Sequence, residues 1–232
     1  MAFLHLTPAE LAALRLSLWV SSWAVAVSLP AGILTAWVLA RTHFRGKNLL
    51  VGLVHLPLVL PPVVIGYLLL VLMGRNGPIG SLLERYLGVV VAFDWKGAAL
   101  AAAVMAFPLM VRAVRLSLEN VDPGLEAAAR TLGAGPFRVF FTVTLPLMTP
   151  GIITGAILAF ARSLGEFGAT ITFVSNIPGR TQTLPLALYS LTQVPDGESG
   201  AMRLCLLSVL VAMAALVGSE VLSRRFAALV RG

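Results

Sequence analysis

Two long runs of this sequence contain no Asp, Glu, Lys or Arg: Leu16 to Ala40 and Leu49 to Gly74. Each run is long enough to cross the hydrocarbon core of a bilayer, which requires about 20 mostly apolar residues in a helix. The composition agrees, since 58% of the residues are apolar and 12% are charged. Soluble proteins carry about 25% charged residues. The sequence therefore predicts a chain that is built mainly for lipid.

Three further apolar runs predict additional membrane spans: Gly97 to Val111, Phe140 to Ala161 and Leu204 to Ser219. The first is short, but Arg112 and Arg115 can extend their side chains to the interface and let the span continue to Leu118. Helices satisfy every backbone polar group internally, as lipid requires. We expect an all-α polytopic membrane bundle of five transmembrane helices, or of six if Phe167 to Leu191 contains another.

The basic residues predict an orientation, because the cytoplasmic ends of membrane spans accumulate Lys and Arg. With five spans, one side receives ten of them: Arg41, Arg45, Lys47, Arg112, Arg115, Arg130, Arg138, Arg224, Arg225 and Arg231. The other side receives six: Arg15, Arg75, Arg85, Lys96, Arg180 and Arg203. We expect residues 1–10 outside, 11–225 as one membrane domain and 226–232 as a cytoplasmic tail. The basic residues form no continuous stripe, which argues against nucleic-acid binding.

Two of the predicted spans carry a similar pattern of prolines. Residues 56–61 (LPLVLP) recur as residues 145–150 (LPLMTP), and Gly66 and Gly155 follow at equal offsets. Proline removes a backbone donor and bends or starts a helix, while small residues let helices approach closely. The alternative is the general tolerance of membrane helices for Pro and Gly. The pattern predicts helix kinks at five prolines: Pro57, Pro61, Pro62, Pro146 and Pro150.

A polar segment, residues 122–146, separates two apolar runs and must lie in water. Asp122 is a suitable N-cap and Pro123 a suitable first helical residue. Gly133 can end a helix in the left-handed conformation, and Pro136 can start the next one. The spacing therefore predicts a helix, a tight turn and a second helix.

The first of these two helices has a surface that suits a protein partner. Residues 127–129 are all alanine and form a slim face, with Leu125 and Leu132 as apolar anchors for a groove. A DNA-binding helix-turn-helix has similar residues at the ends of its helices, but only Arg130 and Arg138 could contact phosphates here. An ordinary solvated loop is the other alternative.

The residues Glu126-Ala127-Ala128, Gly133 and Leu145-Pro146 resemble the EAA loop of the permease subunits of bacterial ATP-binding-cassette importers. The family usually has isoleucine where this chain has Val143. The resemblance implies the type I importer permease fold and a cytoplasmic coupling loop at residues 119–143, which docks in a cleft of an ATP-hydrolysing subunit. The residues implied in that coupling are Leu125, Glu126, Ala127, Ala128, Arg130, Gly133, Leu145 and Pro146.

A second candidate site lies near the end of the fourth span. Arg162 and Glu166 are four residues apart and share one helical face, so a buried charge pair is expected. If the span starts near Thr144, Arg162 lies about 27 Å along it, near the outer edge of the hydrocarbon core. The pair is then either an interface anchor or part of a gate on the translocation pathway. Three hydroxyl groups could add weak donors: Ser163, Thr170 and Thr172.

Residues 160–173 resemble the branch of these permeases that imports sulfate, molybdate and tungstate. The run from Ser163 to Ile177, followed by Pro178-Gly179, looks most like the molybdate permeases, as do Leu56 to Leu70 and Ala101 to Arg115. The resemblance implies a molybdate permease in the bacterial inner membrane. A sulfate, thiosulfate or tungstate permease is the alternative.

The chain has no phosphate-binding loop, because neither Lys47 nor Lys96 completes the required motif. The resemblance implies that the chain is not an enzyme by itself and that two ATPase subunits bind the ATP and magnesium for a permease homodimer. It also implies an external oxyanion-binding protein, for which Gly179 to Gly200 is a candidate landing surface. A secondary transporter or a membrane anchor would need no ATPase. No cofactor or metal is expected, since Cys205 is the only cysteine and the histidines lack ligand spacing.

Overall fold

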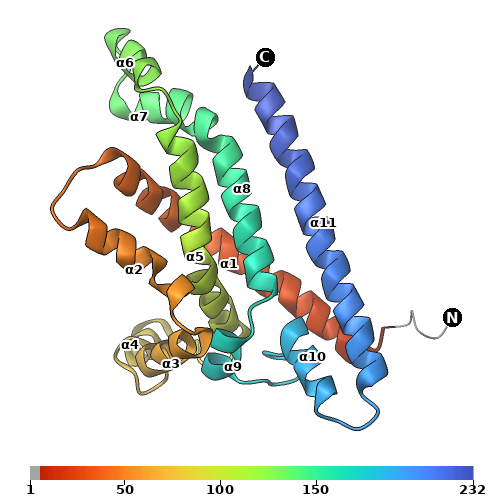
Figure 1. The fold of residues 1–232 in the computed structure, drawn as a ribbon. Helices are drawn as coiled ribbons and strands as arrows, with labels where there is room; N and C mark the ends of the chain where they lie inside the picture. Colours follow the sequence, from red (N-terminus) through yellow and green to blue (C-terminus); the bar gives the residue numbers. More distant parts are fainter. Residues whose placement is uncertain (1–5, 232) are drawn as a thin grey trace.

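The computed structural model describes the backbone of residues 6–231 and the side chains of residues 6–218 and 221 (Figure 1). All of its regular elements in this range are helical. They are α1 (Pro8–Arg41), α2 (Lys47–Val59), α3 (Pro62–Met73), α4 (Pro78–Leu87), α5 (Trp95–Glu119), α6 (Pro123–Thr131), α7 (Pro136–Val139), the π-helical turn η2 (Phe140–Thr144), α8 (Leu145–Leu164), α9 (Gly168–Val174), α10 (Leu184–Thr192) and α11 (Glu198–Arg231).

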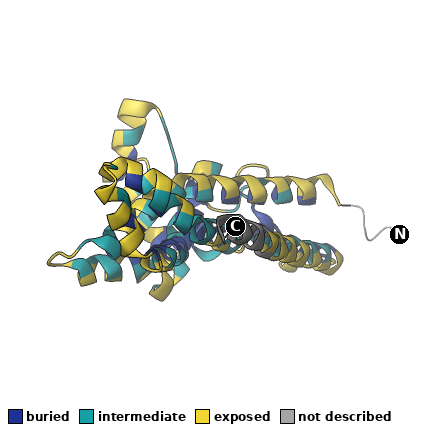
Figure 2. Ribbon diagram, turned by 90° about the horizontal axis from the view of Figure 1, so that it is seen from above, coloured by how far each residue is buried: buried dark blue, intermediate teal, exposed yellow. Residues whose placement is uncertain are grey.

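Helix α5 forms the centre of the bundle, where it packs along α1 and α8. Its buried face is rich in small residues, among them Ala98, Ala101, Ala102 and Ala106. Small side chains let neighbouring helix backbones approach closely. Two thirds of its apolar window (67%) is buried, against 11% for that of α11, which lies at the periphery. Seen from above in Figure 2, exposed residues cover most of the outward faces.

Four helical segments are long and apolar enough to cross a membrane: Pro8–Arg41, Trp95–Glu119, Pro136–Leu164 and Glu198–Gly218. A fifth span is present if α2 and α3 are taken together, but they are bent by 112° at their junction. The kink predicted at Pro61 and Pro62 is therefore confirmed, and the run from Leu49 to Gly74 counts as one span only if the two helices form one broken crossing. Pro61 and Pro62 stand at the bend and cannot donate the backbone hydrogen bonds that would continue α2.

The other three prolines of the two repeated patterns lie inside helical segments. Pro57 lies within α2 and Pro150 within α8. Pro146 follows the π-helical turn, and residues 136–164 together form one candidate span. A π-helical turn changes which carbonyls are bonded, so it can absorb a proline that lacks a donor. The first proline pattern thus ends in a sharp bend between two helices, whereas the second lies within one candidate span.

The segment from Phe167 to Leu191 contains no further span in the described structure. It forms α9 and α10, which have 7 and 9 residues and are each too short to cross a bilayer. The apolar side of α10 does not lie free on a membrane, because Leu184, Leu188 and Leu191 pack with Ala13 and Leu204. This helix is therefore held by α1 and α11.

The two ends of the bundle differ (Figure 1). Helices α6 and α7 lie at one end, which we call the α6 end, while α3, α4, α9 and α10 lie at the other, the α4 end. At the start of α1, the Thr7 and Glu10 side chains and backbones cap each other, and Glu10 also accepts a hydrogen bond of 2.9 Å from Arg203 of α11. Helix α11 continues without a break past residue 226 to Arg231.

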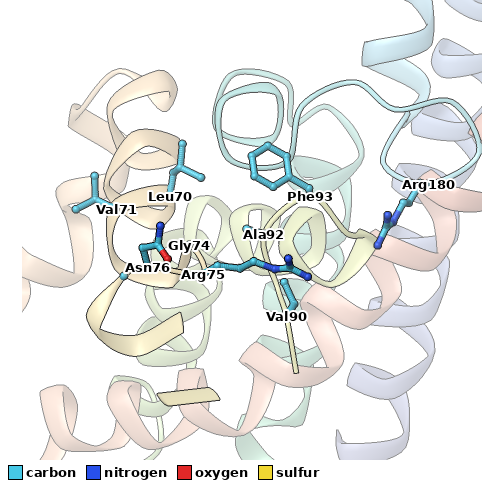
Figure 3. A pocket seen from close by; sticks show the side chains of 10 residues that line it. Leu70, Val71, Gly74, Arg75, Asn76, Val90, Ala92, Phe93 and Arg180 are labelled. Carbon is cyan, nitrogen blue, oxygen red and sulfur yellow. The ribbon is translucent and has the colours of Figure 1, made fainter. Parts of the chain in front are cut away.

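A pocket of about 750 Å³ opens at the α4 end (Figure 3). Arg75, from the α3–α4 connection, and Arg180, from the α9–α10 connection, both line it. Arg180 lies 3.5 Å from a carboxylate oxygen of Asp94, and Arg75 lies 3.8 Å from one of Glu84. Both arginine side chains are more than half exposed, so these ion pairs contribute little to stability.

Gly66 of α3 provides a test of how α3 and α9 pack. A Cβ atom there would lie 2.5 Å from the carbonyl oxygen of Ala169 and 2.9 Å from Cβ of Thr172. Because backbone atoms would have to move, we expect Gly66→Ala to lower stability by about 1–3 kcal/mol. Gly52→Ala is the control, since nothing lies within 4 Å of the added atom. Equal melting temperatures of the two variants in detergent would contradict the close α3–α9 contact.

Candidate functional site

The polar segment between α5 and α8 folds as the sequence predicts. The Asp122 carboxylate accepts a 2.8 Å hydrogen bond from the Gly124 backbone N–H, and α6 begins at Pro123. Gly133 has a φ of +83°, a left-handed conformation that glycine adopts without strain. Helix α7 then begins at Pro136. The helix, tight turn and second helix are confirmed.

Helix α6 presents an apolar surface that nothing in the described chain covers. Leu132 is 88% exposed and Leu125 is 49% exposed. Ala127 and Ala128 are exposed between them, and Arg130 is also on the surface. Large apolar side chains at this level of exposure on a water-facing helix are typical of a protein interface. Of the predicted docking residues, Leu125, Ala127, Ala128 and Arg130 are therefore available to a partner.

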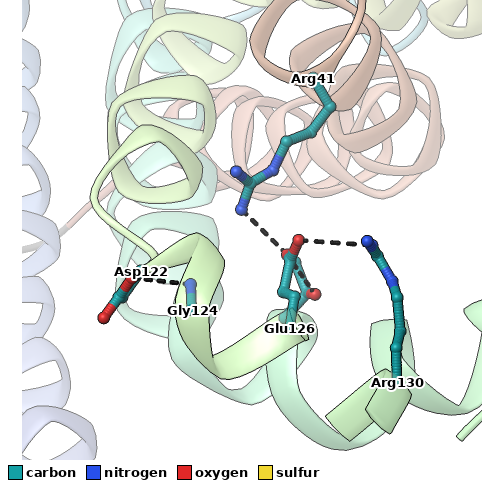
Figure 4. A network of polar contacts seen from close by, with 6 residues as sticks. Arg41, Asp122, Gly124, Glu126 and Arg130 are labelled. Atoms are coloured by element: carbon teal, nitrogen blue, oxygen red, sulfur yellow. Dashed lines mark hydrogen bonds and ion pairs between the residues drawn. The ribbon is translucent and has the colours of Figure 1, made fainter. Parts of the chain in front are cut away.

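Glu126 differs from its neighbours because it is only 8% exposed and faces the bundle (Figure 4). Its Oε1 accepts a hydrogen bond of 2.9 Å from Nη2 of Arg41 and one of 2.8 Å from Oγ1 of Thr144. Nη2 of Arg130 lies 3.7 Å from its Oε2. We call Glu126, Arg41 and Thr144 the Glu126 anchor. The carboxylate expected at the partner contact is thus held mainly within its own chain.

The anchor brings the two halves of the EAA-like pattern together. Thr144 directly precedes Leu145 and Pro146, so the hydroxyl that reaches Glu126 comes from the start of α8. Leu145 packs partly buried against the cluster that includes residues of α5 and α1, while Pro146 is exposed. Glu126 and Thr144, which are 18 residues apart in sequence, are therefore joined by a direct hydrogen bond.

The second predicted site forms the expected ion pair. Nη1 of Arg162 lies 2.7 Å from Oε2 of Glu166, whose side chain is 2% exposed. The other oxygen of Glu166 accepts a 2.8 Å hydrogen bond from the backbone N–H of Ala169, at the start of α9. A carboxylate this deeply buried needs such partners. The pair therefore fixes the turn between α8 and α9.

The three hydroxyl groups predicted near this pair have different roles. Thr172 donates a hydrogen bond of 2.8 Å to the carbonyl oxygen of Gly168 and is already occupied. Ser163 is buried, and its Oγ has no hydrogen-bond partner among the described residues. Thr170 is also buried. The Thr172 hydroxyl is therefore engaged within its own helix, and the Ser163 hydroxyl is closed off from solvent.

Sequence reasoning missed two residues of the Glu126 anchor and the pocket at the α4 end. Arg41 follows an apolar run, and this position indicates only a basic residue at the end of a membrane span. Thr144 had no sequence signal other than its place before Leu145. The amphipathic pattern of residues 78–87, which form α4, could have indicated an additional surface helix.

Comparison with known proteins places this geometry in a family. The model of the binding-protein-dependent transport system inner membrane component matches residues 28–230. The molybdenum transport system permease protein ModB of Escherichia coli (strain K12) is 66% identical, over 94% of this chain and 96% of that protein. ModB of Haemophilus influenzae is 60% identical, over 93% and 94%.

A solved structure of a bacterial ABC transporter involved in the import of the acidic polysaccharide alginate has the same fold. Its chain superposes with a TM-score of 0.73 at 16% identity, covering 95% of this chain and 80% of that one. At this identity the likeness concerns the fold alone. The helical architecture, the match to the family model and the identity to two permeases agree, and the chain is a multi-pass membrane protein that belongs to the family of binding-protein-dependent transport system inner membrane components.

Proposed function

We propose that this chain is the membrane-spanning subunit of an ATP-driven molybdate importer, which moves the oxyanion across the inner membrane by alternating access. The observation that carries the proposal is the 66% identity to a molybdenum permease along almost the whole chain. Hydrolysis of ATP belongs to a separate subunit, which binds the ATP and magnesium. The chain itself acts as a pathway rather than as an enzyme.

The contact with the ATPase is assigned to the exposed face of α6. Leu125, Ala128 and Leu132 offer a slim apolar surface, which suits insertion into a groove of a soluble protein. One such helix per chain and two ATPase subunits per transporter imply a homodimer. In this arrangement the α6 end is cytoplasmic, the N-terminus lies outside and the C-terminus lies inside, as the ten-to-six distribution of basic residues favours.

The α4 end would then face the external binding protein. The pocket there carries Arg75 and Arg180, which suit an acidic rim on a protein that delivers an anion. Gly179 to Gly200, including α10, is part of the same end. The proposed landing surface therefore combines the outer connections with a pocket that two arginine side chains line.

Arg162 and Glu166 are proposed to be part of a gate on the translocation pathway. In the closed state the Arg162 charge is balanced by Glu166. An anion that enters can compete for the guanidinium, and Ser163 and Thr170 add polar groups beside it. The interaction must remain weak, because an importer has to release its cargo.

The cargo is tested by transport. The purified chain, reconstituted in liposomes with its ATPase and its external binding protein, should take up labelled molybdate only when ATP is supplied. Excess sulfate should compete poorly. Efficient competition by sulfate would favour the sulfate permease alternative, and uptake that needs no ATP would favour a secondary transporter.

The docking face is tested by a charge on α6. Leu132→Glu places a carboxylate on an 88% exposed side chain, so folding should be unaffected while ATPase binding weakens by about tenfold or more, the effect of losing an apolar anchor. Val194→Glu, at an exposed apolar position beyond α10, is the matched control and should bind as the wild type does. Unchanged ATPase affinity of Leu132→Glu in a pull-down titration would exclude this docking face.

The gate is tested by removing one charge and then both. Arg162→Gln leaves Glu166 buried without its partner, which should cost about 3–5 kcal/mol of stability. Arg162→Gln with Glu166→Gln should recover most of the melting temperature but should still slow molybdate uptake by about fivefold or more if the pair has a gating role. Full recovery of both stability and uptake in the double variant would leave only a structural role for the pair.

A further inference from the structure

Glu126 is buried on a helix whose other side chains are mostly exposed. It is 8% exposed, whereas Leu125, Ala127 and Ala128 on either side of it are exposed. Glutamate is among the residues least often buried unless it is paired. Its position therefore points to an interaction within the chain.

The partners of Glu126 come from two different helices. Arg41 is the last residue of α1, and Thr144 lies in the turn that leads into α8. Both donate to the same oxygen, Oε1, at 2.9 and 2.8 Å. The Glu126 anchor thus joins α6 to the end of one candidate membrane span, α1, and to the first part of another, Pro136–Leu164.

Apart from its chain connections and the Glu126 anchor, α6 makes few contacts with the bundle. It has 9 residues, too few for an isolated helix to be stable. Among the described elements it packs mainly against α7 and η2, which belong to the same polar segment. The Arg41–Glu126 pair is therefore the direct side-chain link from α6 to α1, beside the chain connection from α6 to α5.

The Arg41 guanidinium binds Glu126 through one of its three nitrogens. Nε of Arg41 is buried and has no hydrogen-bond partner among the described residues, while only Nη2 is engaged. A carboxylate can accept from two N–H groups of one guanidinium at once. The pair is therefore a single hydrogen bond, and Nε of Arg41 is a buried donor that Glu126 does not use.

We propose that Arg41 is a positioning residue for energy coupling: it holds Glu126 inward and passes the movement of α6 to α1. The glutamate of the EAA-like pattern then acts as a link inside the permease, and the exposed apolar face of α6 makes the contact with the ATPase. This inference rests on the proposed function, because it assumes an ATPase that moves α6.

The test compares two arginine variants in the reconstituted transporter. Arg41→Gln breaks the Glu126 anchor, while Arg115→Gln breaks the exposed Arg115–Glu119 pair, of 2.7 Å, near the same end of α5. We expect Arg41→Gln to bind the ATPase normally but to consume about fivefold or more ATP per anion transported, a typical size for a lost coupling. Arg115→Gln should transport with the wild-type ratio.

A second set of variants covers the case in which Arg41→Gln folds poorly. Thr144→Val removes one hydrogen bond and keeps the shape, and should raise the ATP-to-anion ratio by a smaller factor. Arg41→Glu combined with Glu126→Arg should restore part of the coupling that either change alone removes. A wild-type ratio in Arg41→Gln or Thr144→Val, or no recovery in the exchanged pair, would overturn the role of Arg41. Failure of the wild-type chain to bind any ATPase would instead overturn the proposed function.

Discussion

The burial of one carboxylate at the α6 end determines how the polar segment is attached to the bundle. Glu126 would be costly to bury alone, and Arg41 and Thr144 supply the donors that make its position stable. The same contact adds to the chain connections that hold this nine-residue helix against the membrane domain. Leu125 and Leu132, on the same segment, remain exposed while Glu126 is turned inward.

Helix α8 connects the two polar sites of the molecule. It begins beside Thr144 of the Glu126 anchor and ends just after Arg162, which pairs with Glu166. Twenty residues of α-helix measure about 30 Å, which is close to the thickness of a hydrocarbon core. Because α8 also packs along α5, a movement at the α6 end has a rigid route toward the Arg162–Glu166 pair. This route fits a permease that an ATPase drives from one side.

Local signals predicted the elements that local chemistry controls. The N-cap at Asp122, the left-handed Gly133 and the i, i+4 pair of Arg162 with Glu166 depend on residues close in sequence, and all three are confirmed. The bend between α2 and α3 was indicated by prolines, but its angle depends on packing against α9. The inward turn of Glu126 could not be predicted, because Arg41 lies 85 residues away in sequence. A basic residue directly after an apolar run, such as Arg41, is typical of the membrane–water interface.

If Arg41 is the link between α6 and α1, Glu126 stays paired with Arg41 while α6 engages the ATPase, which a structure of the assembled transporter can show. A cryo-electron-microscopy structure in lipid nanodiscs with a non-hydrolysable ATP analogue should show Leu125, Ala128 and Leu132 buried against the ATPase. It should also show the Glu126 carboxylate within hydrogen-bonding distance of Arg41. A Glu126 side chain that has left Arg41 and pairs with a basic residue of the ATPase would rule out Arg41 as the link between α6 and α1.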